Sequence, residues 1–150
     1  MTPHSSFTIT LKNNTTEKEG IKYLLSQDKG FIPLDKNERK IILKAFNLPK
    51  NKSRAFDMVY LKNDKKLSNI NPADITLIEL KVTKKKLRDF PKGFFFGATE
   101  SEFELARKMG NKYKFCFVCL HPESRSYKLL TLEEVNRLIR TKRTQYQINL

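Results

Sequence analysis

Two short apolar segments with charged residues inside them constrain this chain most strongly. The first runs from Ala55 to Leu61 and the second from Ile75 to Val82, and both are rich in β-branched or aromatic residues. Segments of this kind are typical of buried strands. The polar residues 62–69 between them favour a turn. We therefore expect two adjacent antiparallel strands at the centre of the fold.

Three charged side chains interrupt these apolar strands. Period-two alternation places Leu77, Glu79 and Lys81 on one face of the second strand. Asp57 lies in the middle of the first strand. A charge within an apolar run is costly unless it has a partner or a metal ion. Two carboxylates and an ammonium group that converge from adjacent strands make an oxygen-rich site suited to Mg²⁺.

The charge balance indicates a polyanionic partner. The 150 residues carry a net charge of +14, which favours nucleic acid over a membrane because no basic amphipathic anchor is evident. A coding bias toward Asn and Lys is the alternative, but the charge clusters beside the two strands. No apolar run is long enough to span a bilayer, and no signal sequence follows Met1. We expect a single cytoplasmic domain over residues 1–150 with no membrane contact.

Basic residues precede the first of these strands and follow the second. Their position beside the carboxylates predicts contacts with the phosphate backbone. The alternative is that both segments are ordinary solvated loops. The residues concerned are Lys52, Arg54, Lys84, Lys85, Lys86 and Arg88.

An acid on one strand followed by Glu-x-Lys on the next resembles the PD-(D/E)xK nuclease superfamily, to which many restriction endonucleases belong. The match is Asp57, then Glu79-Leu80-Lys81, with Phe56 where the motif has Pro. The resemblance implies that Asp57, Glu79 and the carbonyl of Leu80 hold Mg²⁺, for which Mn²⁺ is expected to substitute. It also implies that Lys81 orients the attacking water or stabilises the transition state.

Capping signals and apolar spacing place helices and further strands around this pair. Ahead of the pair we expect a helix from Thr15 or Thr16 to near Gly30, followed by a strand or turn at Phe31–Leu34. A second helix is expected over Glu38–Phe46, capped by Asp35 or Asn37. Its apolar face is formed by Ile41, Ile42, Ala45 and Phe46. After the pair we expect a helix from a Thr99–Glu102 capping box to Met109, strands at Tyr113–Leu120 and Tyr127–Leu130, and a helix from Thr131 to about Arg143. The order contains the α-β-β-α-β core of the superfamily. We therefore predict an α/β fold, restriction-endonuclease-like, with a mixed central sheet flanked by helices.

One branch of the superfamily is similar over a longer stretch. Mrr-like domains and their plant NO VEIN relatives have a Thr-x-x-Glu helix start, an Ala within the helix and a Tyr entering the next strand. Here these are Thr99, Glu102, Ala106 and Tyr113. The resemblance covers roughly residues 15–120 and extends to the central strand.

Three further acids are candidates to support the site by this resemblance. Glu17 and Glu19 lie on the first predicted helix, where nucleases of the superfamily often carry an acid. Acids at a helix start are equally explained by the helix dipole. Glu102 is explained equally well by its capping box.

The remaining cysteines, histidines and phenylalanines are expected to have no functional role. Cys116 and Cys119 face opposite sides of a strand and are expected to be reduced core thiols. His4 and His121 are isolated, and surface positions are favoured for both. Core packing is favoured over base stacking for Phe90, Phe94, Phe95 and Phe96.

The function predicted on these grounds is Mg²⁺-dependent hydrolysis of DNA, by a restriction-type endonuclease or a nuclease subunit of a restriction-modification system. A structure-selective nuclease such as a Holliday-junction resolvase and a catalytically silent nucleic-acid-binding module remain as alternatives. One site cuts one strand, so we expect a homodimer or a small subunit of a larger nuclease. The alternating segments Phe7–Leu11 and Tyr146–Leu150 are candidates for pairing across such an interface.

Overall fold

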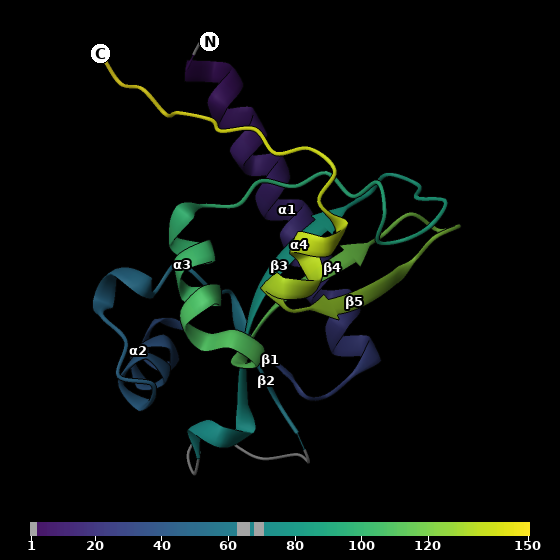
Figure 1. The fold of residues 1–150 in the computed structure, drawn as a ribbon. Helices are drawn as coiled ribbons and strands as arrows, with labels where there is room; N and C mark the ends of the chain where they lie inside the picture. Colours follow the sequence, from purple (N-terminus) through teal and green to yellow (C-terminus); the bar gives the residue numbers. More distant parts are fainter. Residues whose placement is uncertain (1–2, 63–66, 68–70) are drawn as a thin grey trace.

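A mixed five-stranded sheet flanked by helices forms the centre of the computed structural model (Figure 1). The structure describes residues 3–62, 67 and 71–150, and within these ranges it describes side chains from Thr15 onward. The strands follow one another across the sheet in the order β1-β2-β3-β4-β5. Strands β3 and β4 are parallel, and the other neighbouring pairs are antiparallel. The strand bounds are β1 Phe31–Pro33, β2 Met58–Leu61, β3 Ile75–Thr83, β4 Tyr113–Cys119 and β5 Ser126–Leu130.

The helices begin largely where the capping residues predict. Asp35 caps α2, because its Oδ1 accepts the Glu38 N–H at 2.7 Å while the Glu38 side chain accepts the Asp35 N–H at 3.0 Å. Thr131 caps α4 through the same reciprocal arrangement with Glu134. The α-helix bounds are α1 Pro3–Gln27, α2 Lys36–Ala45, α3 Glu100–Met109 and α4 Leu132–Leu138, and short 3₁₀ turns lie at η1 Lys50–Lys52, η3 Pro72–Asp74 and η4 Gly110–Lys112.

The two faces of the sheet carry separate apolar cores. Helix α1 covers one face, where Leu24 packs with Ile78 and other buried side chains. Helices α2, α3 and α4 cover the other face (Figure 1), where Leu77 and Leu105 belong to one cluster. The predicted alternation along β3 is therefore confirmed, since successive residues enter different cores. Among the described residues, no helix is both long enough and apolar enough to cross a bilayer.

Strand β2 pairs with only the first half of β3. The antiparallel register runs from Met58 opposite Ile78 to Leu61 opposite Ile75, as the predicted hairpin requires. Beyond Ile78, β3 continues to Thr83 with β4 on its other side. Asp57 therefore lies immediately before β2, and its expected position in the middle of a strand is wrong. The place where β2 diverges from β3 leaves room for polar side chains between them.

Several predicted boundaries are wrong. Residues Phe7–Leu11 belong to α1 and not to an edge strand, and this helix starts at Pro3 instead of Thr15 or Thr16. The alternating pattern needs a partner strand, and threonine costs a helix only a few tenths of a kcal/mol. Residues Tyr146–Leu150 form no strand, and the side chains of Tyr146, Ile148 and Leu150 are exposed.

Two helices also differ from their predicted extents or faces. Helix α4 ends at Leu138 and not near Arg143, because the residues after it are mostly basic and the one apolar residue among them, Ile139, stays exposed. On α2, Leu43 is buried while Ile41 and Ala45 are exposed. Helical spacing identifies the apolar side of the helix, but the way the helix packs on the sheet decides which residues at the edges of that side are buried.

Helix α1 lies close to β3 at Gly20. A Cβ atom built on Gly20 would lie 2.6 Å from Cγ2 of Val82 on β3. This glycine therefore allows a close crossing of helix and strand. The crossing brings Glu17, one helical turn earlier, over the place where β2 and β3 diverge.

Replacement of Gly20 by Ala tests this close contact. In the wild-type background we expect Gly20→Ala to lower the free energy of unfolding by about 1 kcal/mol, because overpacking outweighs the better helix propensity of Ala. In a Val82→Ala background the same change should raise it by roughly 0.5–1 kcal/mol. Urea denaturation measures both values. Gly97→Ala is the control, because nothing lies within 4 Å of its added Cβ. An equal effect of Gly20→Ala in both backgrounds would contradict the contact.

Candidate functional site

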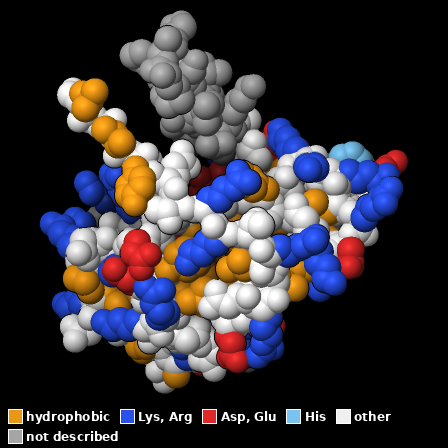
Figure 2. Space-filling view, turned by 45° about the horizontal axis from the view of Figure 1, so that its top comes forward, with side chains coloured by type: hydrophobic (Ala, Val, Ile, Leu, Met, Phe, Trp, Pro, Cys, Tyr) orange, Lys and Arg blue, Asp and Glu red, His pale blue; other side chains and the backbone are white. Residues whose placement is uncertain are grey.

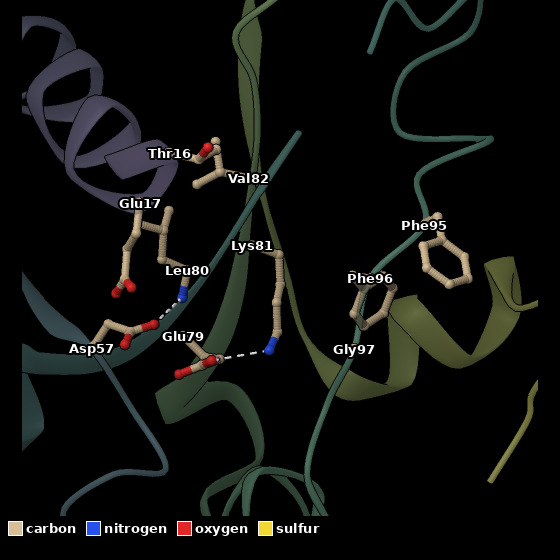
Figure 3. Close-up of a pocket in the computed structure, with 10 residues that line it drawn as sticks. All are labelled: Thr16, Glu17, Asp57, Glu79, Leu80, Lys81, Val82, Phe95, Phe96 and Gly97. Carbon is tan, nitrogen blue, oxygen red and sulfur yellow. Dashed lines mark hydrogen bonds and ion pairs between the residues drawn. The ribbon is translucent and has the colours of Figure 1, made fainter. Parts of the chain in front are cut away.

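A pocket of about 460 Å³ opens where β2 and β3 diverge (Figure 3). One side is lined by Glu17 from α1, Asp57 before β2, and Glu79 with its neighbours on β3. The loop residues Phe95, Phe96 and Gly97 line the opposite side. The three residues predicted to form the centre of the site, Asp57, Glu79 and Lys81, therefore share one pocket, together with Leu80.

Asp57 completes the hydrogen bonding of β3 where its neighbouring strand is missing. The Asp57 N–H donates to the Ile78 carbonyl at 2.8 Å, as a strand neighbour would. Its carboxylate then replaces the next strand residue, because Oδ2 accepts the Leu80 N–H at 2.7 Å. This bond fixes the direction of the carboxylate beside Glu79. The other carboxylate oxygen of Asp57, Oδ1, takes no part in this bond.

Two side chains hold the segment that leads into Asp57. The guanidinium of Arg39 on α2 donates to the carbonyls of Ser53 at 2.7 Å and Asp57 at 3.1 Å, and also to that of Phe56. The hydroxyl of Tyr113 donates to the Ala55 carbonyl at 2.6 Å. Sequence reasoning missed Arg39 as a positioning residue, because a single arginine on a helix has no recognisable spacing to a distant loop.

Glu79 is a buried acid with one unsatisfied oxygen. Its side chain is 8% exposed, and Oε2 lies 3.0 Å from the Lys81 ammonium. Oε1 is buried and has no hydrogen-bond partner among the described residues. Burial and the neighbouring Asp57 carboxylate raise the pKa of Glu79 to about 10, although Lys81 acts in the opposite direction. A buried acid of this kind favours either a proton or a cation on its free oxygen.

Lys81 lies between two carboxylates. Its Nζ is 3.0 Å from Glu79 Oε2 and 2.7 Å from Glu102 Oε1. Burial disfavours its charge, but the two carboxylates prevail and raise the pKa of Lys81 above its ordinary value. The ammonium group is therefore a fixed positive charge at the pocket.

Glu102 faces the site and is more than a capping residue. Thr99 caps α3 as predicted, because its Oγ1 accepts the Glu102 N–H at 3.1 Å. The Glu102 carboxylate does not complete a capping box. Its Oε2 accepts the Thr99 hydroxyl at 3.0 Å, and its Oε1 pairs with Lys81. The structure thus brings Glu102, nearly fully buried, to the predicted centre.

The two acids predicted on α1 have different positions. Glu17 lines the pocket, and burial followed by the nearby Asp57 carboxylate raises its pKa. Figure 3 shows the Glu17 side chain directed toward Asp57. Glu19 does not line the pocket and pairs instead with Lys84 at 3.0 Å. Residues two apart on a helix point in different directions, so one of the two candidates had to lie elsewhere.

The basic residues predicted to contact DNA are engaged to different degrees. Lys52 is mostly buried and pairs with Glu104 on α3 at 2.7 Å. Lys84 and Lys86 are exposed but form surface ion pairs with Glu19 and Glu123. The remaining predicted contacts, Arg54, Lys85 and Arg88, are exposed. Figure 2 shows acidic atoms at the bottom of a hollow, with Lys and Arg side chains on the surface around it.

The phenylalanines after this basic segment divide into two groups. Phe94 and Phe96 pack edge-to-face on Phe117, each with ring centroids 5.0 Å apart, and Phe90 contacts Phe94. Core packing is confirmed for these three residues. It is wrong for Phe95, whose side chain is 93% exposed beside the pocket.

The cysteines are buried free thiols, as predicted. Cys116 belongs to the core under α1. The Cys119 thiol contacts the Lys85 carbonyl and the Ser124 hydroxyl. His121 is partly exposed, and its ring accepts the Glu123 N–H. His4 lies in α1, outside the residues whose side chains are described.

The chain matches no protein-family model, no curated protein and no solved structure in comparisons with known proteins. The functional argument therefore depends on the site itself. As the side chains lie, no group of three Asp, Glu, His or Cys residues in the described part of the chain forms a ready-made metal site. Glu79 directs one oxygen toward Lys81, and its other oxygen is unsatisfied. The chemistry of Asp57 and Glu79 fits a hard cation such as Mg²⁺.

The raised pKa of Glu79 predicts how stability depends on pH in metal-free protein. The folded state keeps a proton on Glu79 up to about pH 10, whereas the unfolded chain releases it near the ordinary value of 4.5. The stabilisation is therefore complete below pH 4.5 and is lost as pH rises toward 10. We expect Glu79→Gln to flatten the fall in the free energy of unfolding between about pH 5 and 9.

Denaturation with urea in the presence of a chelator measures this dependence. Glu104→Gln on α3 is the matched control, since its partner Lys52 lowers the pKa of Glu104 and keeps its titration below this window. Parallel pH curves for wild type and Glu79→Gln would show that Glu79 is ionised in the folded protein.

Proposed function

We propose that this protein is a Mg²⁺-dependent DNA endonuclease with a restriction-endonuclease-like core of the PD-(D/E)xK kind. The observation that carries the proposal is the buried, unsatisfied Oε1 of Glu79, in a pocket shared with Asp57 and Lys81. An acid in this position costs stability, and a cation would offset that cost. Because Glu79 lines a pocket and is not enclosed in the core, a ligand can reach it, and acids with perturbed pKa values in such places are candidates for catalysis.

Asp57, Glu79 and the carbonyl of Leu80 are the groups that would hold the ion. When bound, Mg²⁺ would supply Lewis-acid stabilisation of the scissile phosphate and acidify a bound water. The fit is one of donor chemistry, since carboxylate and carbonyl oxygens are the ligands that this ion takes. The hydrogen bond from the Leu80 N–H holds the Asp57 carboxylate in place for this role.

The other residues of the pocket have roles that follow from their contacts. Glu102 keeps Lys81 charged and directed into the pocket, where the ammonium group can donate to a phosphate oxygen or to the attacking water. Glu17 adds a carboxylate on the side of Asp57, and its raised pKa makes this carboxylate a better acceptor for a proton from water. Arg39 acts through the backbone before Asp57 and is a positioning residue.

The arrangement of elements supports the same proposal. The order α2-β2-β3-α3-β4 agrees with the α-β-β-α-β core that the resemblance implies, and α3 connects two parallel strands. The motif acids lie at the divergence of β2 and β3. The net charge of +14 favours a polyanionic substrate.

Cleavage of both DNA strands requires two such sites. A homodimer, or association with a larger nuclease chain, would supply the second site. Because Phe7–Leu11 is helical, strand pairing through that segment is no longer part of the proposal. The exposed apolar residues of Tyr146–Leu150 remain available for a partner.

Catalysis is tested with supercoiled plasmid and a four-way junction, each with Mg²⁺ or with chelator. We expect wild type to cut in Mg²⁺ alone, and Glu79→Gln and Asp57→Asn to lose at least about a hundredfold in rate, because each removes a charge from the metal position. Both variants should still bind DNA. Mg²⁺ should raise the melting temperature of wild type but not of Glu79→Gln. Glu133→Gln on α4 is the control, since this exposed acid pairs only with Arg137 among the described residues.

Each alternative has its own result in this experiment. Cleavage by Glu79→Gln at the wild-type rate would reject the assignment of the site. DNA binding without cleavage under any metal would indicate the silent binding module. Cleavage confined to the junction would indicate the structure-selective nuclease.

The exposed basic residues predict the salt dependence of DNA binding. Lys85→Ala and Arg88→Ala should each weaken binding to all sequences alike and reduce the slope of log affinity against log salt by about one. Lys84→Ala and Lys86→Ala should change it less, because these side chains pair with Glu19 and Glu123. Fluorescence anisotropy over a salt series measures the slopes, with Lys40→Ala on α2 as the control. Unchanged slopes for Lys85→Ala and Arg88→Ala would identify the segment as a solvated loop.

A further inference from the structure

Phe95 is an aromatic side chain that the fold exposes. Its side chain is 93% exposed, more than any other large apolar residue of the described chain outside Tyr146–Leu150. Folding normally removes such a ring from water. The neighbouring Phe94 and Phe96 follow this rule, because their rings pack on the core. The exposure of Phe95 therefore needs an explanation of its own.

The loop holds Phe95 in a defined place. Phe94 and Phe96 flank it in the chain, and each ring contacts Phe117 of β4 with a centroid distance of 5.0 Å. The backbone is thus anchored directly before and after Phe95 while the ring itself is directed outward. A ring presented in this way loses little conformational freedom when a ligand binds to it.

The ring lies on the rim of the pocket that contains the carboxylates. Phe95 and Phe96 line the side opposite Asp57 and Glu79 (Figure 3). The pocket volume of about 460 Å³ lies within the roughly 300–1,000 Å³ of sites for small ligands. Its volume suits a nucleotide-sized unit. The same loop begins with the exposed cations Lys85 and Arg88.

We propose that Phe95 stacks on an unpaired base of a single-stranded DNA segment and that the adjoining phosphate lies toward Asp57, Glu79 and Lys81. The inference rests on the proposed function and narrows its substrate to DNA that offers an unpaired segment. A stacked base would use the exposed apolar face, and the exposed cations Lys85 and Arg88 of the same loop would serve the backbone, which is the combination that binds single strands. A protein partner would use the ring as well, but it would not account for the net charge of +14 or for Lys81 in the same pocket.

The absence of tryptophan from the chain makes a direct test available. Phe95→Trp introduces a single tryptophan at the proposed stacking position, and Ile41→Trp introduces one at an exposed position on α2, away from the pocket. In chelator, so that nothing is cut, labelled single-stranded DNA and a duplex of equal length are titrated into the full chain. We expect single-stranded DNA to quench Phe95→Trp strongly and Ile41→Trp little.

Affinities of further variants complete the test. Phe95→Ala and Phe95→Leu should weaken binding of the single strand about tenfold, which corresponds to about 1.4 kcal/mol and lies within the range of about 1–3 kcal/mol per stacked base. Phe95→Tyr should retain the wild-type affinity. Binding of the duplex should change less than about twofold in every variant. Circular dichroism and melting curves confirm that each variant is folded.

The outcomes separate this inference from the proposed function. Quenching and the tenfold loss in a protein that never cuts would support stacking while rejecting catalysis. Cleavage that depends on Glu79, with wild-type affinity of Phe95→Ala for single strands, would overturn stacking alone. Equal losses on duplex and single strand would also overturn it. So would a change in self-association of Phe95→Ala, measured by sedimentation, without a change in DNA affinity, since the ring would then be a protein contact.

Discussion

The hydrogen bond from the Leu80 N–H to the Asp57 carboxylate is the interaction on which the pocket depends. Strand β2 stops pairing with β3 at Ile78, so the Leu80 N–H on the same edge of β3 has no strand partner. A buried N–H without a partner is costly. The Asp57 side chain satisfies it at 2.7 Å, and in doing so it is placed beside Glu79 at the mouth of the gap.

Charge balance then determines how the rest of the pocket is arranged. Glu17, Asp57, Glu79 and Glu102 meet in a small volume, and Lys81 contacts two of them. Burial, followed by repulsion from the neighbouring Asp57 carboxylate, raises the pKa of Glu79 to about 10. Without a further cation the cluster is held by a retained proton. The same repulsion gives a bound cation its stabilising effect.

Local signals predicted the elements that depend on local contacts. Asp35, Thr99 and Thr131 each cap a helix as expected, because a side-chain cap satisfies N–H groups only two or three residues away. The hairpin of β2 and β3 and the alternation along β3 were predictable for the same reason. The terminal segments were not, since a strand pattern such as Phe7–Leu11 acquires meaning only from a partner strand.

The sequence by itself determined that Asp57, Glu79 and Lys81 lie on neighbouring apolar segments, because strand periodicity and hairpin pairing are short-range. Only the tertiary structure decided which other residues join them. Glu17 entered and Glu19 did not, because the close crossing at Gly20 sets the rotation of α1 over β3. Arg39 reached the backbone of Asp57, and Phe95 stayed exposed while its neighbours packed on Phe117. These outcomes depend on contacts between distant segments, and no periodicity along the chain encodes them.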